Sequence, residues 1–363
     1  MQNFGGTQTL ADIVNAIQPV ERHWIEKARE KTAALVMPPR ALGRLHDFAE
    51  RICAIQCSLK PDIDRKIIVI MAGDHGVVQE GVSAYPQEVT REMIRTFLNG
   101  GAGINILAAQ AGADMVVVDM GVRAEFESGA PVSDPRFRLN KIAPGTANMV
   151  KGPAMTRHDA ELAVMNGFQT ASELCLNGFQ ILGTGDMGIG NTTASAAIGV
   201  VFTSADVNAM VGRGTGVDDH GLNRKKDIVR RAIALNQPDP DDGLDVLAKV
   251  GGFEIGGIAG SILAAAYHRC PVVIDGFIST AGALIAHALA PKVTDYIFAA
   301  HCSEEPGHRI MLSHLELEPI IDLGMRLGEG SGAALAMPLL QSAVGIFNDM
   351  WTFEKAGVSD KDA

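Results

Sequence analysis

The stretch KIIVIMAGDHG, residues 66–76, is the clearest indication of the fold, because its apolar run ends on glycine and polar residues. Later stretches repeat this pattern, namely ADMVVVDMGV (113–122), GFQILGTGDMG (178–188), PVVIDGF (271–277) and YIFAAHCSEEPGH (296–308). Short runs rich in Val and Ile are typical of parallel strands that are buried on both faces. We therefore predict that these stretches are strands of one mainly parallel sheet.

Helical patterns lie between the predicted strands. They include QEVTREMIRTFLNGGAGINILAAQAG (87–112), DAELAVMNGFQTASELCLN (159–177) and GALIAHALA (282–290). Strands that alternate with helices indicate an open, doubly wound α/β sheet, in which ligands gather beyond the carboxyl ends of the strands. The polar residues that end each strand therefore mark the expected site.

Both ends of the chain lack this alternation and contain only helical patterns. The N-terminal ones are LADIVNAIQ (10–18), PVERHWIEKAREKTAALVM (19–37) and RALGRLHDFAERICAIQ (40–56). Their amphipathic spacing predicts helices that must bury one face. We expect residues 1–60 and 330–363 to form a small helical domain, and residues 61–329 to form a large α/β substrate-binding domain.

The composition limits the classes of function. With 47% hydrophobic residues, the 363-residue chain can bury a large core, and its net charge of -11 argues against a nucleic-acid surface. No apolar run reaches the roughly 20 residues of a membrane span, and no signal-peptide pattern opens the sequence. We expect a cytoplasmic protein with free thiols at its scattered cysteines and a small-molecule partner.

Glycine is unusually frequent, because 40 of the 363 residues are glycine. This fraction is above the roughly 7% that is typical of proteins. The clearest cluster is GTGDMGIGNTTASAAIGVVF (183–202), which follows a predicted strand and opens an apolar helix. Asn191, Thr192 and Thr193 lie where side chains cap helices, and free amides at a helix N-terminus bind phosphate. The pattern alone is compatible with a phosphate site or with a capped helix after a tight turn.

The same stretch also has the G-x-G-x-x-G spacing of a dinucleotide site, at Gly183, Gly185 and Gly188. Such a site needs a second strand that ends on an acidic residue about 20 positions later. Asp206 is near that distance, but SADVNAMVGRGTG (204–216) around it does not resemble a strand. The dinucleotide interpretation is therefore disfavoured.

Two further clusters of polar residues leave alternatives open. HCSEEPGH (301–308) gathers possible metal ligands, but the spacing matches no zinc pattern, so a structural loop or a loop that lines a substrate site is favoured over a metal site. Asp74 and His75 follow the first predicted strand and are either catalytic or part of a turn. In RLGEGSGAALAM (326–337), Glu329 lies between two glycines that offer it no side-chain partner.

Taken together, these motifs closely resemble the nicotinate-nucleotide:dimethylbenzimidazole phosphoribosyltransferases of cobalamin biosynthesis. The matching segments run in the same order from about residue 35 to residue 348 and comprise GDHGVVQEGVSAYPQEVT (73–90), GGAGINILA (100–108), GDMGIGNTT (185–193), GRGTG (212–216), GGFEIGGIAG (251–260), DGFISTAGAL (275–284), EPGH (305–308) and MRLGEGSGAALAMPLLQSA (325–343). The resemblance implies a Rossmann-like large domain, a small domain built from both termini, a homodimer, and no metal or cofactor. It also implies transfer of phosphoribose from nicotinate mononucleotide to a benzimidazole nitrogen.

The resemblance assigns roles to individual residues. Glu329 corresponds to the general base, and Asp186 is placed to support the ribosyl cation, although the family motif usually has the longer glutamate there. Further matches imply phosphate and ribose contacts at Gly188, Gly190, Asn191, Thr192, Arg213 and Asp275, and a base pocket at Ser83, Tyr85 and Gln87. Burial would raise the pKa of Glu329 and the helix N-terminus after Ser331 would lower it, and the sequence does not decide between them.

Other functions remain open at this point. The same chemistry could use another acceptor, such as adenine, a different benzimidazole or a phenol. An NAD-dependent oxidoreductase and a catalytically idle binding protein are rivals from other classes, and the presence of Glu329 disfavours the idle protein.

Overall fold

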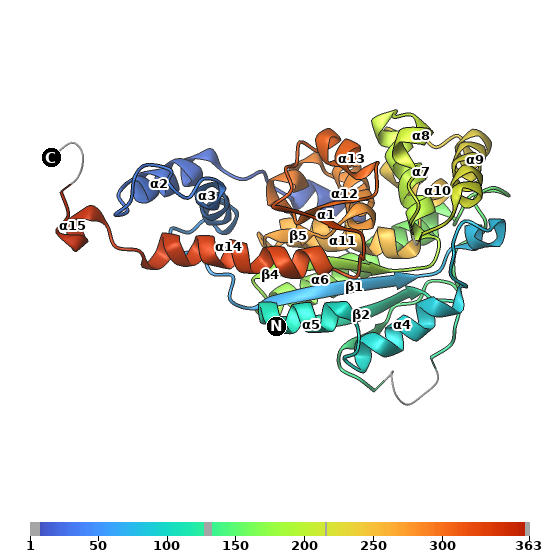
Figure 1. Cartoon of the computed structure of the whole chain (residues 1–363), viewed down its shortest axis with the longest axis horizontal. Coiled ribbons are helices and arrows are strands. Elements are labelled where there is room, and N and C mark those ends of the chain that lie inside the picture. The colour runs from blue at the N-terminus through green and yellow to red at the C-terminus, as the bar shows by residue number, and fades with distance from the viewer. Residues whose placement is uncertain (1–7, 127–132, 215, 360–363) are drawn as a thin grey trace.

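The computed structural model describes residues 8–126, 133–214 and 216–359 (Figure 1). Its strands are β1 (Lys66–Gly73), β2 (Ala113–Gly121), β3 (Phe137–Leu139), β4 (Ile181–Met187), β5 (Val272–Ile274), β6 (Ile297–Ala299), β7 (His301–Ser303) and β8 (Ile321–Met325). Its α-helices are α1 (Leu10–Ala16), α2 (Arg22–Ala33), α3 (Arg44–Gln56), α4 (Glu88–Leu98), α5 (Gly103–Ala111), α6 (Arg157–Leu176), α7 (Asn191–Thr203), α8 (Val207–Met210), α9 (Asp219–Asn236), α10 (Gly243–Val250), α11 (Phe253–Tyr267), α12 (Phe277–Leu289), α13 (His308–His314), α14 (Ser331–Asp349) and α15 (Phe353–Ala356). Two 3-10 helices, η1 (Gly76–Glu80) and η2 (Pro291–Tyr296), follow β1 and α12.

The central sheet has the strand order β3-β2-β1-β4-β5-β6, and each of its described pairings is parallel. This is the strand order of a Rossmann-type doubly wound sheet. The order in which the strands are added reverses between β1 and β4, although the strands themselves stay parallel. The predicted α/β class and the mainly parallel sheet are confirmed. The reversal matters for function because it leaves a crevice beyond the carboxyl ends of the central strands.

Helices cover both faces of the sheet. The contacts of β1 side chains that point to opposite faces show which helix lies on which face. Ile68 lies against Gly330 at the start of α14, whereas Met71 lies against Gly257 of α11. Because neighbouring side chains of a strand point to opposite faces, α14 and α11 pack on opposite sides of β1. Helix α5 packs with α14, and α6 packs with α11.

Two predicted elements are divided in the structure. The helical pattern 87–112 forms α4 and α5, because Gly100 adopts a left-handed φ of 80° between them. The last predicted strand, within 296–308, forms β6 of the main sheet and then β7, which pairs with β8 in a separate two-stranded sheet. Strands β3 and β8 were not predicted, since neither has a long apolar run.

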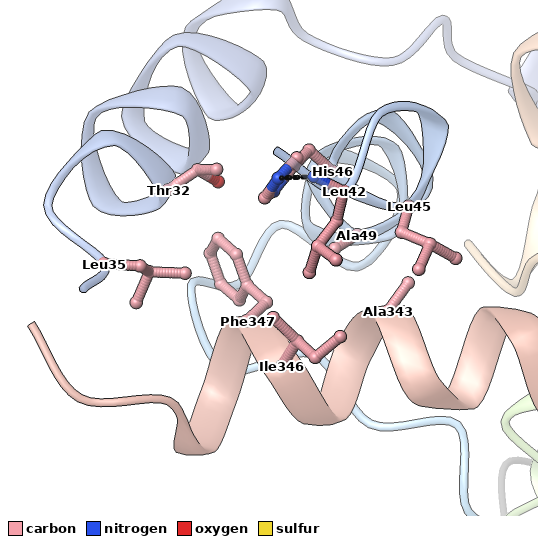
Figure 2. Close-up of a pocket in the computed structure, with 9 residues that line it drawn as sticks. All are labelled: Thr32, Leu35, Leu42, Leu45, His46, Ala49, Ala343, Ile346 and Phe347. Atoms are coloured by element: carbon pink, nitrogen blue, oxygen red, sulfur yellow. Dashed lines mark hydrogen bonds between the residues drawn. The ribbon is translucent and has the colours of Figure 1, made fainter. Parts of the chain in front are cut away.

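The terminal helices pack in two places. Helices α2 and α3 meet the last turns of α14 in a small cluster of Ala28, Ala49, Cys53, Ala343 and Phe347. Figure 2 shows this packing, which encloses a cavity of only about 10 Å³. Helix α1 instead contributes its apolar side chains to the core of the sheet.

The division of the chain into residues 1–60 with 330–363 and residues 61–329 remains a prediction. Residues 1–7 and 360–363 lie outside the described residues. Helix α14 is continuous from the sheet, where Met337 is buried, to the terminal cluster, where Phe347 is buried. Any boundary near residue 330 therefore lies at the start of a helix that serves both regions.

Candidate active site

A cavity of about 500 Å³ opens beyond the carboxyl ends of β4 and β5. This volume is typical of pockets for small molecules, and the position is the one expected for a doubly wound sheet. Of the predicted site residues, the cavity is lined by Tyr85, Asp186, Gly188, Asn191, Thr192 and Glu329. These residues come together from three separate parts of the chain, around residue 85, within 186–192 and at residue 329.

Glu329 is held in an unusual backbone conformation at the edge of this cavity. Its φ is 65°, and Gly328 and Gly330 on either side also have positive φ values of 81° and 91°. Left-handed backbone is costly for Glu329, which has a side chain, whereas glycine adopts it readily, so the conformation of Glu329 is one that the surroundings impose. The turn packs so closely on β4 that a methyl group on Gly185 would lie 2.6 Å from the carbonyl oxygen of Glu329.

Glu329 is only 7% exposed, and its Oε2 has no hydrogen-bond partner within the part of the chain that the structure describes. Burial raises the pKa of Glu329, the amide of Ile104 lowers it through a hydrogen bond, and Asp275 raises it further, so the net shift is upward. A raised carboxyl pKa suits a general base that works near neutral pH. The amide that opposes the shift belongs to α5 and not to α14.

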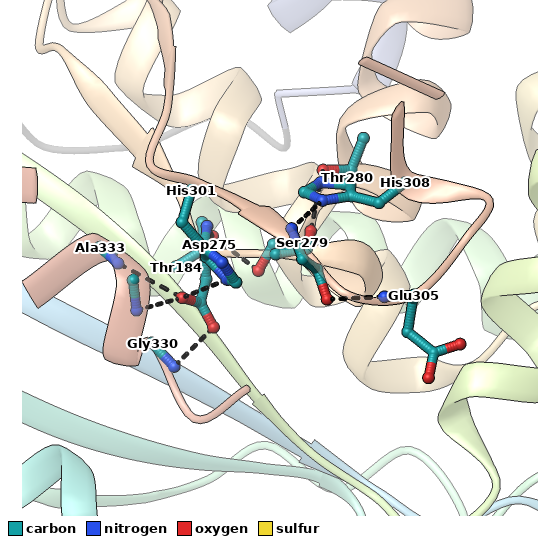
Figure 3. A network of polar contacts seen from close by, with 12 residues as sticks. Thr184, Asp275, Ser279, Thr280, His301, Glu305, His308, Gly330 and Ala333 are labelled. Atoms are coloured by element: carbon teal, nitrogen blue, oxygen red, sulfur yellow. Dashed lines mark hydrogen bonds and ion pairs between the residues drawn. The ribbon is translucent and has the colours of Figure 1, made fainter. Parts of the chain in front are cut away.

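The first amides of α14 are occupied by Asp275, which follows β5. Its Oδ2 accepts from the amide of Gly330 at 3.0 Å, and its Oδ1 accepts from Gly332 at 2.6 Å and from Ala333 at 3.3 Å (Figure 3). These hydrogen bonds satisfy amides that a helix N-terminus leaves free. Asp275 therefore holds the Glu329 turn, and it is not among the residues that line the cavity.

A second buried carboxyl group, Asp186, lies at the end of β4. Its Oδ2 accepts from the Asn191 side chain at 2.9 Å, and a methyl group on Gly328 would lie 3.4 Å from both carboxylate oxygens. Burial raises the pKa of Asp186 well above its usual range, and the neighbouring carboxyl groups of Asp275, Glu254 and Glu329 add to this. These surroundings favour the neutral acid, and a positive charge beside Asp186 would favour the carboxylate.

The turn between β4 and α7 lines the next part of the cavity. The helix cap is Gly190, with φ 97°, and no side chain of the described residues caps α7, so the expected cap at Asn191, Thr192 or Thr193 is wrong. Only a glycine fits easily there, because a methyl group on Gly190 would lie 2.8 Å from Val78. A helix N-terminus that opens on a cavity without a capping side chain is suited to an anion.

The dinucleotide fingerprint is not formed. Gly183 and Gly185 lie within β4, where they allow Met337 and the Glu329 turn to approach the strand, and do not form a phosphate turn. Asp206 caps the short helix α8 by accepting from the amide of Asn208. The glycine spacing thus serves the packing of α14 against the sheet.

Two cations lie near the end of the cavity that the N-terminus of α7 faces. The ammonium group of Lys225, on α9, donates to Thr192 Oγ1 at 2.7 Å and to Gly212 O at 3.3 Å. Burial lowers the pKa of Lys225 to about 8, and Glu305 opposes this shift. Arg326 lines the rim and donates to the carbonyl of Gly214.

Arg213, the cation that the motifs suggested, points elsewhere. Its guanidinium is 2.5 Å from Asp219 Oδ1 and donates to the carbonyl of Val217, and its side chain is 52% exposed. Lys225 was missed, although a signal exists in the sequence. It lies on the buried face of α9 with Gly221, Ile228 and Ala232, where an apolar residue would be expected.

The predicted base pocket is only partly assembled. Tyr85 lines the cavity and is 54% exposed, and its amide donates to Ser83 Oγ at 3.1 Å. The Gln87 side chain donates a hydrogen bond to the carbonyl of His75 and accepts one from Arg123, so it supports the conformation of this segment. Ser83 and Gln87 are not among the lining residues.

The loop 301–308 contributes to the wall of the cavity. His301, Ser303 and Glu305 line it, whereas the neighbouring His308 is bonded to Thr280 and has a pKa that burial lowers to about 3. Within the described ranges, no group of three or more His, Cys, Asp or Glu side chains could hold a metal ion. None of the described helices is long and apolar enough to cross a membrane.

Comparison with known proteins identifies the class of this site. A family model described as phosphoribosyltransferase matches residues 17–358, so the α/β fold and its cavity belong to an enzyme of that class. The chain is 51% identical over 351 residues to the nicotinate-nucleotide–dimethylbenzimidazole phosphoribosyltransferase of Geotalea uraniireducens, with 97% of this chain and 98% of that protein covered. Its counterpart in Geobacter sulfurreducens is 50% identical over 353 residues, with 97% and 99% covered.

Solved structures agree with this result. The crystal structure of CobT from Thermus thermophilus matches with a TM-score of 0.88 and 47% identity, covering 93% of this chain and 99% of that one. The chain therefore belongs to the nicotinate-nucleotide–dimethylbenzimidazole phosphoribosyltransferase family, and the family suggested by the sequence motifs is confirmed.

Proposed function

We propose that the protein transfers 5-phosphoribose from nicotinate mononucleotide to 5,6-dimethylbenzimidazole, giving α-ribazole 5'-phosphate and nicotinate. The observation that carries this proposal is that one cavity holds both Glu329, a buried carboxyl group with a raised pKa, and the uncapped N-terminus of α7. The first can take a proton from a nitrogen heterocycle, and the second can hold a phosphate. The family and its relatives' names support the same reaction.

The acceptor chemistry is assigned to Glu329. The lone-pair nitrogen of the benzimidazole attacks C1' of the ribose, and its ring gains positive charge as the new bond forms. Glu329 removes the proton from the other ring nitrogen, which leaves a neutral product. The flanking glycines leave room for a flat ring against the backbone, and Tyr85 offers an aromatic surface in the same cavity.

The donor chemistry is assigned to the β4–α7 region. Nicotinate leaves when the electron pair of its bond to C1' returns to the pyridinium nitrogen, so the leaving ring needs no proton. The ribose carries positive charge in the transition state, and Asp186 is placed to stabilise it as a carboxylate. The 5'-phosphate is assigned to Gly188, Gly190, Asn191 and Thr192, with Lys225 in place of Arg213.

The decisive experiment supplies the protein with nicotinate mononucleotide and a mixture of bases and identifies the products by mass spectrometry. We expect α-ribazole 5'-phosphate to dominate. A nucleotide of adenine, another benzimidazole or a phenol would keep the chemistry and change the acceptor. No nucleotide product, combined with a thermal shift on adding NAD, would favour the oxidoreductase instead.

The phosphate assignment has its own test, which compares nicotinate mononucleotide with nicotinate riboside. The riboside lacks the anion that the α7 N-terminus and Lys225 would hold, so we expect it to react far more slowly. Equal rates for the two donors would remove the phosphate role of this turn.

We further propose that the protein is a cytoplasmic homodimer. The family resemblance supports both the homodimer and the cytoplasmic location. Light scattering on the purified protein should give a mass twice that of the 363-residue chain. A monomer that is fully active at the same concentration would contradict the dimer.

A further inference from the structure

A buried ion pair between His75 and Glu254 lies behind the Gly188–Gly190 turn, and His75 has no role in the chemistry described so far. His75 follows β1 and Glu254 lies in the first turn of α11, and their side chains are 1% and 0% exposed. The distance from His75 Nε2 to Glu254 Oε1 is 2.6 Å. Burial lowers the pKa of His75, but Glu254 and Asp74 raise it, and the net shift is upward. The short contact with a buried carboxyl group favours the imidazolium form of the ring.

The ring of His75 bridges Glu254 and the turn that faces the cavity. On one edge, a methyl group on Gly190 would lie 3.2 Å from His75 Cβ, and one on Gly188 would lie 3.7 Å from Cδ2. On the opposite edge, a methyl group on Gly252 would lie 2.4 Å from Cε1, beside the bond to Glu254. The order in space is thus Glu254, His75, the 188–190 turn and then the cavity.

The fold fixes this order by close packing. A methyl group on Gly188 would lie 2.1 Å from the carbonyl oxygen of Gly73, so the turn rests directly on the end of β1. On the other side, a methyl group on Gly73 would lie 2.8 Å from Glu254 Oε2. The carboxylate of Glu254 lies in the first turn of α11, where the helix dipole favours negative charge. Neither charge can move away from the turn without repacking these contacts.

We propose that His75 is a positioning residue for the donor: its imidazolium, held by Glu254, directs the positive end of this ion pair towards the Gly188–Gly190 turn and strengthens binding of the 5'-phosphate without touching it. The inference rests on the proposed function, because it assigns the phosphate to this turn. A charge in a low-dielectric interior acts over several ångströms, so contact is not required. A buried ion pair contributes little to stability compared with an apolar pair of the same size, so a gain in stability does not account for its place beside the turn.

The test measures kcat/KM with nicotinate mononucleotide and with nicotinate riboside in the wild type and in His75→Gln. The substitution removes the charge, and we expect kcat/KM to fall about tenfold with the nucleotide and to change little with the riboside. The affinity for ribose 5-phosphate, measured by calorimetry, should weaken by a similar factor. An equal loss with both donors would show that the pair is only structural.

A double variant separates charge from folding. His75→Gln with Glu254→Gln replaces the ion pair by neutral groups that can still hydrogen-bond, so it removes the unpaired buried carboxylate that the single variant leaves. We expect its thermal stability to recover towards the wild type while the phosphate-specific loss persists. Recovery of the nucleotide's kcat/KM in the double variant would overturn the proposal.

His308→Gln is the matched control. His308 is also 1% exposed and is bonded to Thr280 Oγ1 at 2.9 Å, but it does not lie behind the turn. Any loss in this variant should affect both donors by the same factor. A wild type that does not use nicotinate mononucleotide would defeat the proposed function, and ribose 5-phosphate binding would then test the ion pair by itself.

Discussion

The fold raises the pKa of the carboxyl groups of Glu329 and Asp186. Burial is the largest cause of the raised pKa in both, and for Asp186 three neighbouring carboxyl groups add to it. Such groups are costly to the folded state when they ionise. Their presence around one cavity is what a site for a cationic donor and a proton-releasing acceptor requires.

Glu329→Gln tests the general base. The amide has nearly the same size but cannot take a proton, so we expect kcat to fall about 100- to 10,000-fold while the affinity for nicotinate mononucleotide changes little. Steady-state kinetics and calorimetry measure the two quantities. A variant that keeps the wild-type rate would rule out Glu329 as the base.

The pH dependence follows from the direction of the Glu329 shift. The base works as the carboxylate, so kcat should fall as the pH drops through the raised pKa, at a higher pH than for an ordinary glutamate. The free energy of unfolding depends on pH in the opposite direction. Because the folded-state pKa exceeds the unfolded one, the stabilisation is full below the unfolded pKa and is lost as the pH rises through the folded pKa. Glu329→Gln should remove the Glu329 contribution to both dependences and leave that of Asp186, whose pKa is also raised. Profiles of kcat and of melting temperature against pH that are unchanged in the variant would contradict the assignment to Glu329.

Asp186→Asn tests the support of the ribosyl cation. The sugar is common to every acceptor, so turnover should fall by a similar factor for benzimidazoles and adenine. A reordered preference among bases, measured in competition assays, would show instead that Asp186 contacts the acceptor. Asp186→Glu restores the family's usual residue, and a faster variant would show that the reach of the side chain limits the rate.

At the scale of elements, the turn before α14 is the part that places the base. Asp275 holds the start of the helix through three amides, and the turn lies flat against β4 at Gly185. Left-handed backbone at Glu329 persists because these contacts over-determine it. The position of Glu329 therefore depends on strands β4 and β5 as much as on its own motif.

Gly185→Ala tests this dependence. The new methyl group would lie 2.6 Å from the Glu329 carbonyl oxygen, so the turn must shift, and we expect kcat to fall by at least tenfold. Gly345→Ala is the control, because nothing lies within 4 Å of its added methyl group on α14. The control should leave kcat unchanged and should leave the melting temperature unchanged or raise it slightly. Normal kcat in the Gly185 variant would mean that the turn is not held by β4.

At the scale of the whole molecule, α14 joins the site to the terminal helices. It begins at the Glu329 turn, crosses the sheet region and ends in the cluster with α2 and α3 (Figure 1). Helix α1 lies with the sheet, so the two ends of the chain contribute to both regions. The cluster is small, which suggests that it opens more easily than the main core.

Phe347→Ala tests the independence of this cluster. Removing a buried phenylalanine typically costs about 3–5 kcal/mol, and Phe347 is 2% exposed beneath Lys31. Hydrogen exchange should increase first in α2 and α3, while the sheet stays protected. Leu176→Ala, at a side chain 60% exposed on α6, should have little effect. Uniform loss of protection in the Phe347 variant would mean that the terminal helices unfold together with the sheet.

The sequence by itself determined the α/β class, the main strands and the family. Apolar runs such as 66–73 are long enough to identify buried parallel strands, and glycine-rich motifs place polar residues at their ends. It also brought out Glu329 and Asp186, because their motifs match those of the family. These features are local in the chain, so the order of residues is sufficient to reveal them.

Only the tertiary structure decided which of the remaining candidates reach the cavity. Asp275 is used by the amides of α14, Arg213 turns to Asp219, and Lys225 approaches Thr192 from a helix with no motif of its own. The pairing of His75 with Glu254 joins residues 179 positions apart. Hydrogen bonds, burial and pKa shifts depend on neighbours in space, and a chain that folds into parallel strands with crossovers brings together residues whose distance in sequence gives no indication of it.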